Sequence, residues 1–396
     1  MSIHLRSWRR RGTTLAVAAG VAALAALTVV PTASAATTGT AAAATSARIA
    51  QAGTRVQVPW AKVGPGWELV QYTTRKAGEP AKPAPVTLYL MGPGGARYPL
   101  YTWSASAPQP YLVAWSGDKA RALLEFPATG KAAQLSLATG KLSTFTMAGQ
   151  ATPLAYTRPS GQNILGWQQV GNTVRLARFS LTGQLLKVLV TGPSSYNPTA
   201  LYSADGTVLA VPADKGITLI SNLGRVIRSL PAGGTSATGC WPVRWWDAHS
   251  VLTSCTQQNF APPRLWLVPL SGAKPTAMTP QRGPSSPDLG DLDAWQLRSG
   301  LYLQGATGCG EGQIFGQAAN GSITRVTIPG ATGFDNRVVT ASGSRLLVKA
   351  ETGCEGSDSL LWINPATHAE QWLLHAPQTE AGVQSVVPYY DRANAS

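Results

Sequence analysis

Residue types that often carry catalysis or metal binding are scarce in this 396-residue sequence. It contains four histidines, four cysteines and 18 acidic residues, against 32 lysines and arginines. Only His249, His368 and His375 follow the N-terminal segment, so no histidine-based catalytic or metal site is expected. The sequence also lacks the motifs of zinc peptidases, serine hydrolases, P-loop proteins and dithiol redox proteins.

Long apolar runs are missing beyond the N-terminus, so no membrane-spanning helix is expected in the mature chain. Near the N-terminus, four arginines precede an apolar stretch that ends near Val30, and Ala33-Ser34-Ala35 matches the pattern cleaved by signal peptidase. We therefore predict a signal peptide over residues 1–35 and a secreted protein, extracellular or associated with the cell wall. A membrane anchor formed by the same stretch is the alternative. An Ala- and Thr-rich spacer (36–55) and a single domain (56–396) are predicted to follow.

Runs of like charge are also absent from the mature sequence. The net charge is +14, but the basic residues beyond the N-terminal segment are scattered singly. A clustered basic surface would be typical of nucleic-acid binding, so no nucleic-acid partner is expected. A solubilising surface charge is the simpler interpretation.

Short strand-like segments recur where helical periodicity is missing. Alternating or apolar runs of five or six residues end in tight turns, and each turn leads into another short strand. The turn position is glycine in six copies and histidine in the seventh, at spacings of 41–49 residues: Gly95, Gly140, Gly183, Gly224, Gly272, Gly321 and His368. Tight hairpins need a positive φ, which glycine adopts readily. The repeat predicts an all-β fold, a seven-bladed β-propeller of four-stranded antiparallel blades.

A second marker follows the first in register and predicts the innermost strand of each blade. An apolar strand closes on an aromatic or aliphatic residue and then a small polar turn, at Val113–Ser116, Leu154–Thr157, Ala200–Gly206, Trp245–Asp247, Trp295–Arg298 and Val338–Thr340. The first repeat lacks this marker, whereas the C-terminal segment Gln384–Asp391 carries it. We predict that this segment joins the first blade and closes the ring. Addition to the outer edge of the seventh blade is the alternative.

The sequence of one predicted turn resembles a turn that recurs in known repeat proteins. Tyr202-Ser203-Ala204-Asp205-Gly206 resembles the aromatic-Ser-x-Asp-Gly turn of TolB-like and WD40-like propeller repeats, and Trp115-Ser116-Gly117-Asp118 is a looser match. Other copies depart from it, with Arg158-Pro159 and Ala248-His249 at the corresponding places. The resemblance implies a binding scaffold and no particular reaction.

The four cysteines predict two disulfides in an exported protein. Loops that enter the first strand and loops between the second and third strands lie on one face of a propeller. All four cysteines fall in or beside such loops, and we predict the pairs Cys240–Cys255 and Cys309–Cys354 among three possible pairings.

The same face is predicted to collect acids and aromatic residues. The acids are Asp288, Asp291, Asp293, Glu311, Asp335, Glu355 and Asp358. Three interpretations are open: a calcium site at Asp288, Asp291 and Asp293, a catalytic pair Glu311 and Glu355 for glycan chemistry, or solvated loop carboxylates, which we favour. Aromatic side chains near this face could stack on a ligand or belong to the core, and the core is favoured: Trp241, Trp295 and Phe334.

Together these features predict a secreted, non-enzymatic, monomeric propeller that acts as a binding or scaffold module of the cell envelope or extracellular space. Its partner would be a protein or a cell-envelope polysaccharide, bound at the disulfide-bearing loops. No cofactor is expected, with calcium as the only candidate. An exported carboxylate-dependent glycan hydrolase or lyase using the same face is the alternative function.

Overall fold

The structure is a computed structural model that describes residues 57–74, 84–193, 199–213, 216–234, 237–257, 262–283, 286–307, 310–328, 336–351, 358–375 and 381–389. Strands account for nearly all of its regular structure. Within the described ranges, helical conformation is limited to short 3-10 turns, which include Trp60–Lys62 and Ala148–Gln150. No described helix is long and apolar enough to cross a membrane.

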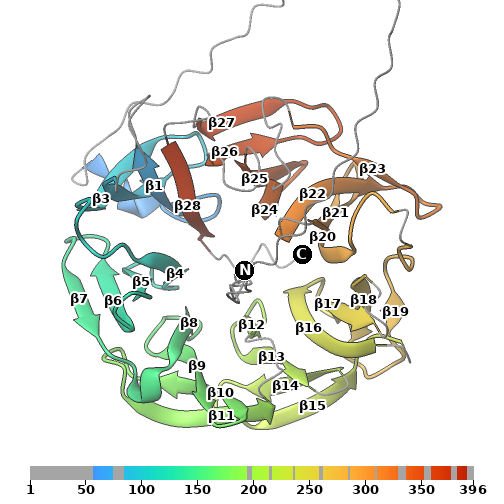
Figure 1. The fold of residues 1–396 in the computed structure, drawn as a ribbon, viewed down its shortest axis with the longest axis horizontal. Helices are drawn as coiled ribbons and strands as arrows, with labels where there is room; N and C mark the ends of the chain where they lie inside the picture. The colour runs from blue at the N-terminus through green and yellow to red at the C-terminus, as the bar shows by residue number, and fades with distance from the viewer. Residues whose placement is uncertain are drawn as a thin grey trace, which may run out of the picture. The chain divides into compact units, whose positions relative to one another are not determined.

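The described strands form seven antiparallel sheets of four strands each, arranged in a ring (Figure 1). From the innermost strand outward, the first four blades are β28 (Ala381–Pro388), β1 (Glu68–Thr74), β2 (Val86–Met91), β3 (Arg97–Trp103); β4 (Tyr111–Trp115), β5 (Arg121–Phe126), β6 (Lys131–Ser136), β7 (Leu142–Phe145); β8 (Thr152–Tyr156), β9 (Ile164–Val170), β10 (Thr173–Phe179), β11 (Leu185–Pro193); and β12 (Leu201–Tyr202), β13 (Val208–Ala213), β14 (Gly216–Ser221), β15 (Val226–Pro231). Blades 5 to 7 are β16 (Ala237–Trp245), β17 (Ser250–Gln257), β18 (Arg264–Pro269), β19 (Thr276–Ala277); β20 (Asp291–Leu297), β21 (Gly300–Thr307), β22 (Gly310–Gln317), β23 (Ile323–Arg325); and β24 (Asn336–Ser342), β25 (Arg345–Glu351), β26 (Asp358–Ile363), β27 (Glu370–Leu374). The predicted fold class is therefore confirmed.

The seven turn residues that defined the repeat all lie in the hairpin between the third and fourth strands. Their φ angles run from 57° at His368 to 86° at Gly183. These values fall in the left-handed region, where glycine has little steric strain because it lacks a Cβ atom. The spacing of these residues in the sequence therefore reports the blade period directly.

The ring is closed by the C-terminal strand. β28 pairs antiparallel with β1, with Ser385 opposite Gln71, and so forms the innermost strand of blade 1 (Figure 1). This confirms the predicted closure. The alternative position at the outer edge of blade 7 is wrong, because β27 ends that sheet and β28 belongs to another.

The core is divided among the junctions between blades. The described apolar residues form seven buried clusters, and each cluster draws side chains from two neighbouring blades. At the closing seam, for example, Val70 of β1 and Val383 of β28 pack with Leu347 and Trp362 of blade 7. Burial of this kind makes each blade depend on its neighbours for its apolar contacts.

Two buried glutamines add polar links between blades. Gln71 in the second strand of blade 1 accepts a hydrogen bond from Leu112 N (2.8 Å) and donates one to Pro110 O (3.1 Å) in blade 2. Ser385 Oγ of β28 also donates to the Gln71 carbonyl oxygen. One side chain therefore joins the closing strand, its own blade and the next blade.

Gln304 repeats this arrangement between blades 6 and 7. It accepts from Val338 N (2.8 Å) and donates to Asn336 O (2.9 Å). In both cases the receiving strand has a bulge directly after the residue whose N–H donates. The strand registers place apolar side chains at the equivalent position of the other five blades: Leu123, Leu165, Ala210, Leu252 and Leu347.

Candidate functional site

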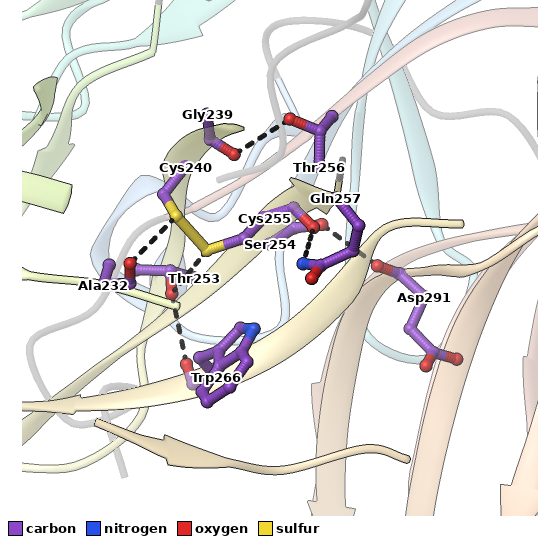
Figure 2. Close-up of a disulfide and its surroundings, with 10 residues drawn as sticks. All are labelled: Ala232, Gly239, Cys240, Thr253, Ser254, Cys255, Thr256, Gln257, Trp266 and Asp291. Atoms are coloured by element: carbon purple, nitrogen blue, oxygen red, sulfur yellow. Dashed lines mark hydrogen bonds between the residues drawn. A yellow bond between two sulfur atoms is a disulfide. The ribbon is translucent and has the colours of Figure 1, made fainter. Parts of the chain in front are cut away.

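The disulfide marks one face of blade 5. Cys240 in β16 and Cys255 in β17 are bonded, with Cα atoms 4.1 Å apart and a sequence separation of 15 (Figure 2). The predicted pairing is confirmed. The loop position predicted for the two cysteines is wrong. β16 and β17 are longer than the sequence indicated, so both cysteines lie within strands. They are directly opposite each other in the register of the two strands. The bond therefore ties the ends of the two innermost strands of this blade.

The same hairpin is fixed to blade 6. Ser254 Oγ of β17 donates to the main-chain oxygen of Asp291 at 3.0 Å, a contact visible in Figure 2. Within blade 5, Thr253 Oγ1 donates to Trp266 O at 3.3 Å. The disulfide end of β17 is thus held on both sides, as part of the buried wall between blades.

An ion pair joins blades 5 and 6 next to this hairpin. Arg244 of β16 donates two hydrogen bonds to Asp293 of β20, from Nε to Oδ1 at 2.8 Å and from Nη2 to Oδ2 at 2.7 Å. The same guanidinium lies 4.5 Å from the ring centroid of Trp295. Two-point pairing and stacking fix the Arg244 side chain more firmly than a single bond would. Trp295 is a buried core residue, as the favoured interpretation had it.

A second arginine lies between the other two aspartates. Arg282 Nη2 is 3.4 Å from Asp291 Oδ1, and its Nε is 3.9 Å from Asp288 Oδ1. All three side chains are buried. Burial raises the pKa of Asp291 to about 6, a rise that the nearby Arg282 charge only partly opposes. The Oδ2 atoms of both aspartates are buried and have no hydrogen-bond partner among the residues that the structure describes.

The favoured interpretation of these three aspartates as solvated loop carboxylates is therefore wrong. Asp288, Asp291 and Asp293 are at most 5% exposed, and arginines from the preceding blade or loop face them. In the part of the chain that the structure describes, no three acidic, histidine or cysteine side chains gather as a metal site would require. A calcium ion at these aspartates stays a prediction, and it would have to share the carboxylates with guanidinium groups.

The remaining predicted residues divide into two groups. Trp241 is half-buried in β16, next to Cys240 and opposite Ser254. Glu311 and Asp358 lie in strands, at the ends of β22 and β26, but their side chains are outside the described part of the structure. The other positions lie outside the described residues altogether, so the second disulfide and the carboxylate pair stay predictions: Cys309, Phe334, Asp335, Cys354 and Glu355.

Arg282 is a buried residue of this junction, paired with Asp291, that the sequence did not reveal. It stands alone between Gln281 and Gly283, without a motif. Arg244 had a weak signal, because it precedes Trp245 and Trp246 and so suggested a basic and aromatic cluster. Its role in pairing a carboxylate of the next blade depends on the ring arrangement.

No family model and no curated protein matches this chain. Several solved structures are similar to it. A puromycin-hydrolyzing peptidase from Mycobacterium tuberculosis is similar at 16% identity and a TM-score of 0.50, over 78% of this chain and 53% of that one. TolB from Acinetobacter baumannii (13% identity, TM-score 0.44, 81% and 66% covered) and AztD from Citrobacter koseri (12%, 0.46, 82% and 97%) are also among the matches.

This chain is a seven-bladed β-propeller. At these identities the likeness to solved structures shows the fold alone, and the chain spans about half of the peptidase and about two thirds of TolB. The function of this propeller must therefore be argued from its own residues. Its most distinctive face is the junction of blades 5 and 6, where a disulfide, a two-point ion pair and a buried Arg–Asp cluster meet.

Proposed function

We propose that this propeller is an exported, non-enzymatic binding module that holds a protein or a cell-envelope polysaccharide on the face with the disulfide. Export is supported by the N-terminal arginines, the apolar stretch and the cleavage pattern at Ala33-Ser34-Ala35. A disulfide in the folded domain fits an oxidising compartment.

The observation that carries the proposal is the set of contacts that fixes side chains and strands at the blade 5–6 junction. Arg244 is held by Asp293 and stacked on Trp295, and the Cys240–Cys255 bond fixes the strand beside it. A preorganised face loses little conformational entropy when a partner binds. Half-exposed Trp241 offers an apolar and stacking surface at this place.

The described acids support binding more than acid–base catalysis. A glycan hydrolase needs one protonated and one ionised carboxyl group, both open to the substrate, at a separation of about 5–9.5 Å. Asp288, Asp291 and Asp293 are instead buried against arginines. The catalytic alternative therefore depends on Glu311 and Glu355.

The test uses the chain from residue 49 onward, because all seven blades are complete within residues 57–389. An insoluble cell-wall preparation serves as the probe, with and without prior protease treatment. We expect the protein to sediment with the wall and Trp241→Ala to weaken binding by about tenfold. Leu223→Ala is the control, because Leu223 is 65% exposed and lies in the turn between β14 and β15, on the opposite side of the blades from the disulfide.

The outcomes separate the candidate functions. Binding that survives protease treatment supports a polysaccharide partner, and binding that protease abolishes supports a protein partner. Release of soluble sugar fragments that stops in Glu311→Gln or Glu355→Gln would replace the binding proposal with the catalytic one. No retention on either preparation would refute it.

A further inference from the structure

Exposed aliphatic side chains gather on the outer strands of blades 3 and 4. Leu185 and Leu186 begin β11, Leu223 is 65% exposed at the turn before β15, and Val226 and Ile227 begin β15. We call these five residues the outer apolar patch. The described part of the chain has only two other large apolar side chains with comparable exposure, Tyr111 and Leu289. This concentration on one rim distinguishes the patch from singly scattered apolar residues.

The two hairpins of the patch are in direct contact. A Cβ atom at Gly224 would lie 3.0 Å from Leu189 Cδ2 and 3.2 Å from its Cα, so the turn that carries Leu223 packs on β11. β11 and β15 are the outermost strands of adjacent blades (Figure 1). The patch therefore extends over two blades.

The charged side chains within the patch are cations, and one exposed acid, Asp205, lies in the adjoining turn, where Thr207 O accepts a hydrogen bond from Asn222 N. Lys187, Arg225 and Arg228 are exposed and interleave with the aliphatic residues, and neither segment 180–193 nor segment 216–231 contains an acid. Arg228 Nη1 donates to Leu270 O of blade 5 at 2.8 Å, which holds one of these cations in place. An apolar surface edged mainly by cations is complementary to an anionic amphipathic one.

The geometry favours a surface over a peptide strand as the occupant. A strand added to β15 would pair with one edge and cover only one blade. Leu223 lies in a turn, outside any strand edge, and Leu185 and Leu186 belong to the neighbouring blade. A lipid interface can receive all five aliphatic residues while its headgroups meet the cations.

We propose that the outer apolar patch is a peripheral docking surface for a membrane that contains anionic phospholipid. The aliphatic side chains enter the boundary between headgroups and acyl chains, and Lys187, Arg225 and Arg228 face the phosphates. The patch lies at the hairpin turns between third and fourth strands, on the opposite side of the blades from the disulfide. A membrane-bound propeller would therefore keep its disulfide face free for a partner.

Vesicle cosedimentation tests the proposal with the chain from residue 49 onward, because the apolar N-terminal stretch would itself bind lipid. Vesicles of phosphatidylcholine alone and with phosphatidylglycerol are compared in low and high salt. We expect binding to the phosphatidylglycerol vesicles and a marked loss in high salt, because screening weakens the headgroup attraction.

Three variants locate the binding surface. Leu223→Ser combined with Ile227→Ser is expected to weaken binding by about tenfold, because apolar groups leave the interface. Lys187→Gln and Arg225→Gln should each weaken it by about fivefold, the equivalent of about 1 kcal/mol per cation near the membrane. Leu289→Ser is the matched control, because Leu289 is 56% exposed and lies beside β20 at the disulfide end.

The proposal is overturned if binding to neutral and anionic vesicles is equal, or if Leu289→Ser weakens binding as much as the patch variants do. It is also overturned if the protein does not bind vesicles and the patch instead binds an acidic, apolar peptide. That result would assign the surface to a peptide that binds as an added strand. Unchanged thermal unfolding of the variants shows that any loss is not caused by misfolding.

Discussion

Glu68 provides the sharpest test of the structure, because its carboxyl group is buried without a partner. It lies in β1 between Met91 of β2 and Pro388 of β28, and its side chain is fully buried. Among the described residues, neither carboxyl oxygen has a hydrogen-bond partner. Side chains alternate between the two faces of a strand, so Glu68 lies on the same face of β1 as Val70, which packs against blade 7. Burial raises the pKa of Glu68 well above its ordinary value of 4.5, and no neighbouring charge opposes this.

The sign of the pH effect follows from this raised pKa. Below about 4.5 the group is protonated in both the folded and the unfolded chain and does not affect stability. As the pH rises from there towards the raised native pKa, only the unfolded chain releases its proton. Each pH unit in that window should lower the free energy of unfolding by about 1.4 kcal/mol. Above the native pKa the penalty stays constant.

Substitution of Glu68 by glutamine removes the titration with little change in volume. Urea unfolding of both proteins at a series of pH values, from below 4.5 to neutrality, gives the difference in the free energy of unfolding. We expect this difference to grow in favour of Glu68→Gln as the pH rises. The exposed Glu370→Gln in β27 is the control and should show no such trend. A difference that is independent of pH, or that grows in favour of glutamate, would refute the assignment of a neutral, unpaired carboxyl group.

Three further changes test other contacts. Replacing Cys240 and Cys255 together by serine should lower the free energy of unfolding by about 3 kcal/mol, because the bond closes a loop of 15 residues; calorimetry that finds an unchanged melting temperature would contradict this. Gln304→Leu fits the apolar position of most other blades but leaves a buried N–H and C=O unpaired, so urea unfolding should show a loss of about 2–4 kcal/mol. Arg244→Met should cost about 3–5 kcal/mol, because it removes the two-point ion pair of the buried Asp293 carboxylate. The double variant with Asp293→Leu should recover most of this loss, and a double variant as unstable as the single one would argue against the ion pair.

The blade architecture could be predicted because its signals are local. A positive φ at the hairpin turn restricts the residue type within a few positions, and glycine or His368 therefore recurs once per blade. The closing strand was predictable for a related reason. The first repeat lacked an innermost strand and the C-terminal segment had the matching pattern, so the two had to pair.

Burial and pairing across blades were not predictable, because they depend on residues far apart in the sequence. Asp293 pairs with Arg244, 49 residues away, and nothing local in the sequence indicates that the two side chains form an ion pair. Gln71 and Gln304 give no signal either, since a polar residue in a strand usually marks the solvent side. The strand registers show that Gln71 and Gln304 occupy the same position in the second strand of their blades as Leu123 does in blade 2. Only this register reveals that both glutamines are buried between blades.

The ring closure also has a consequence in time. Gln71 of β1 and Ser385 of β28 are 314 residues apart, so at a synthesis rate of roughly 5–20 residues per second the first strand waits about 15–60 s for its partner. Until β28 is present, blade 1 lacks its innermost strand and has an open edge. Contacts of such long range also form slowly once both strands exist. The propeller therefore completes its fold late, and a chain truncated before β28 is expected to remain sensitive to protease long after the central blades have become resistant.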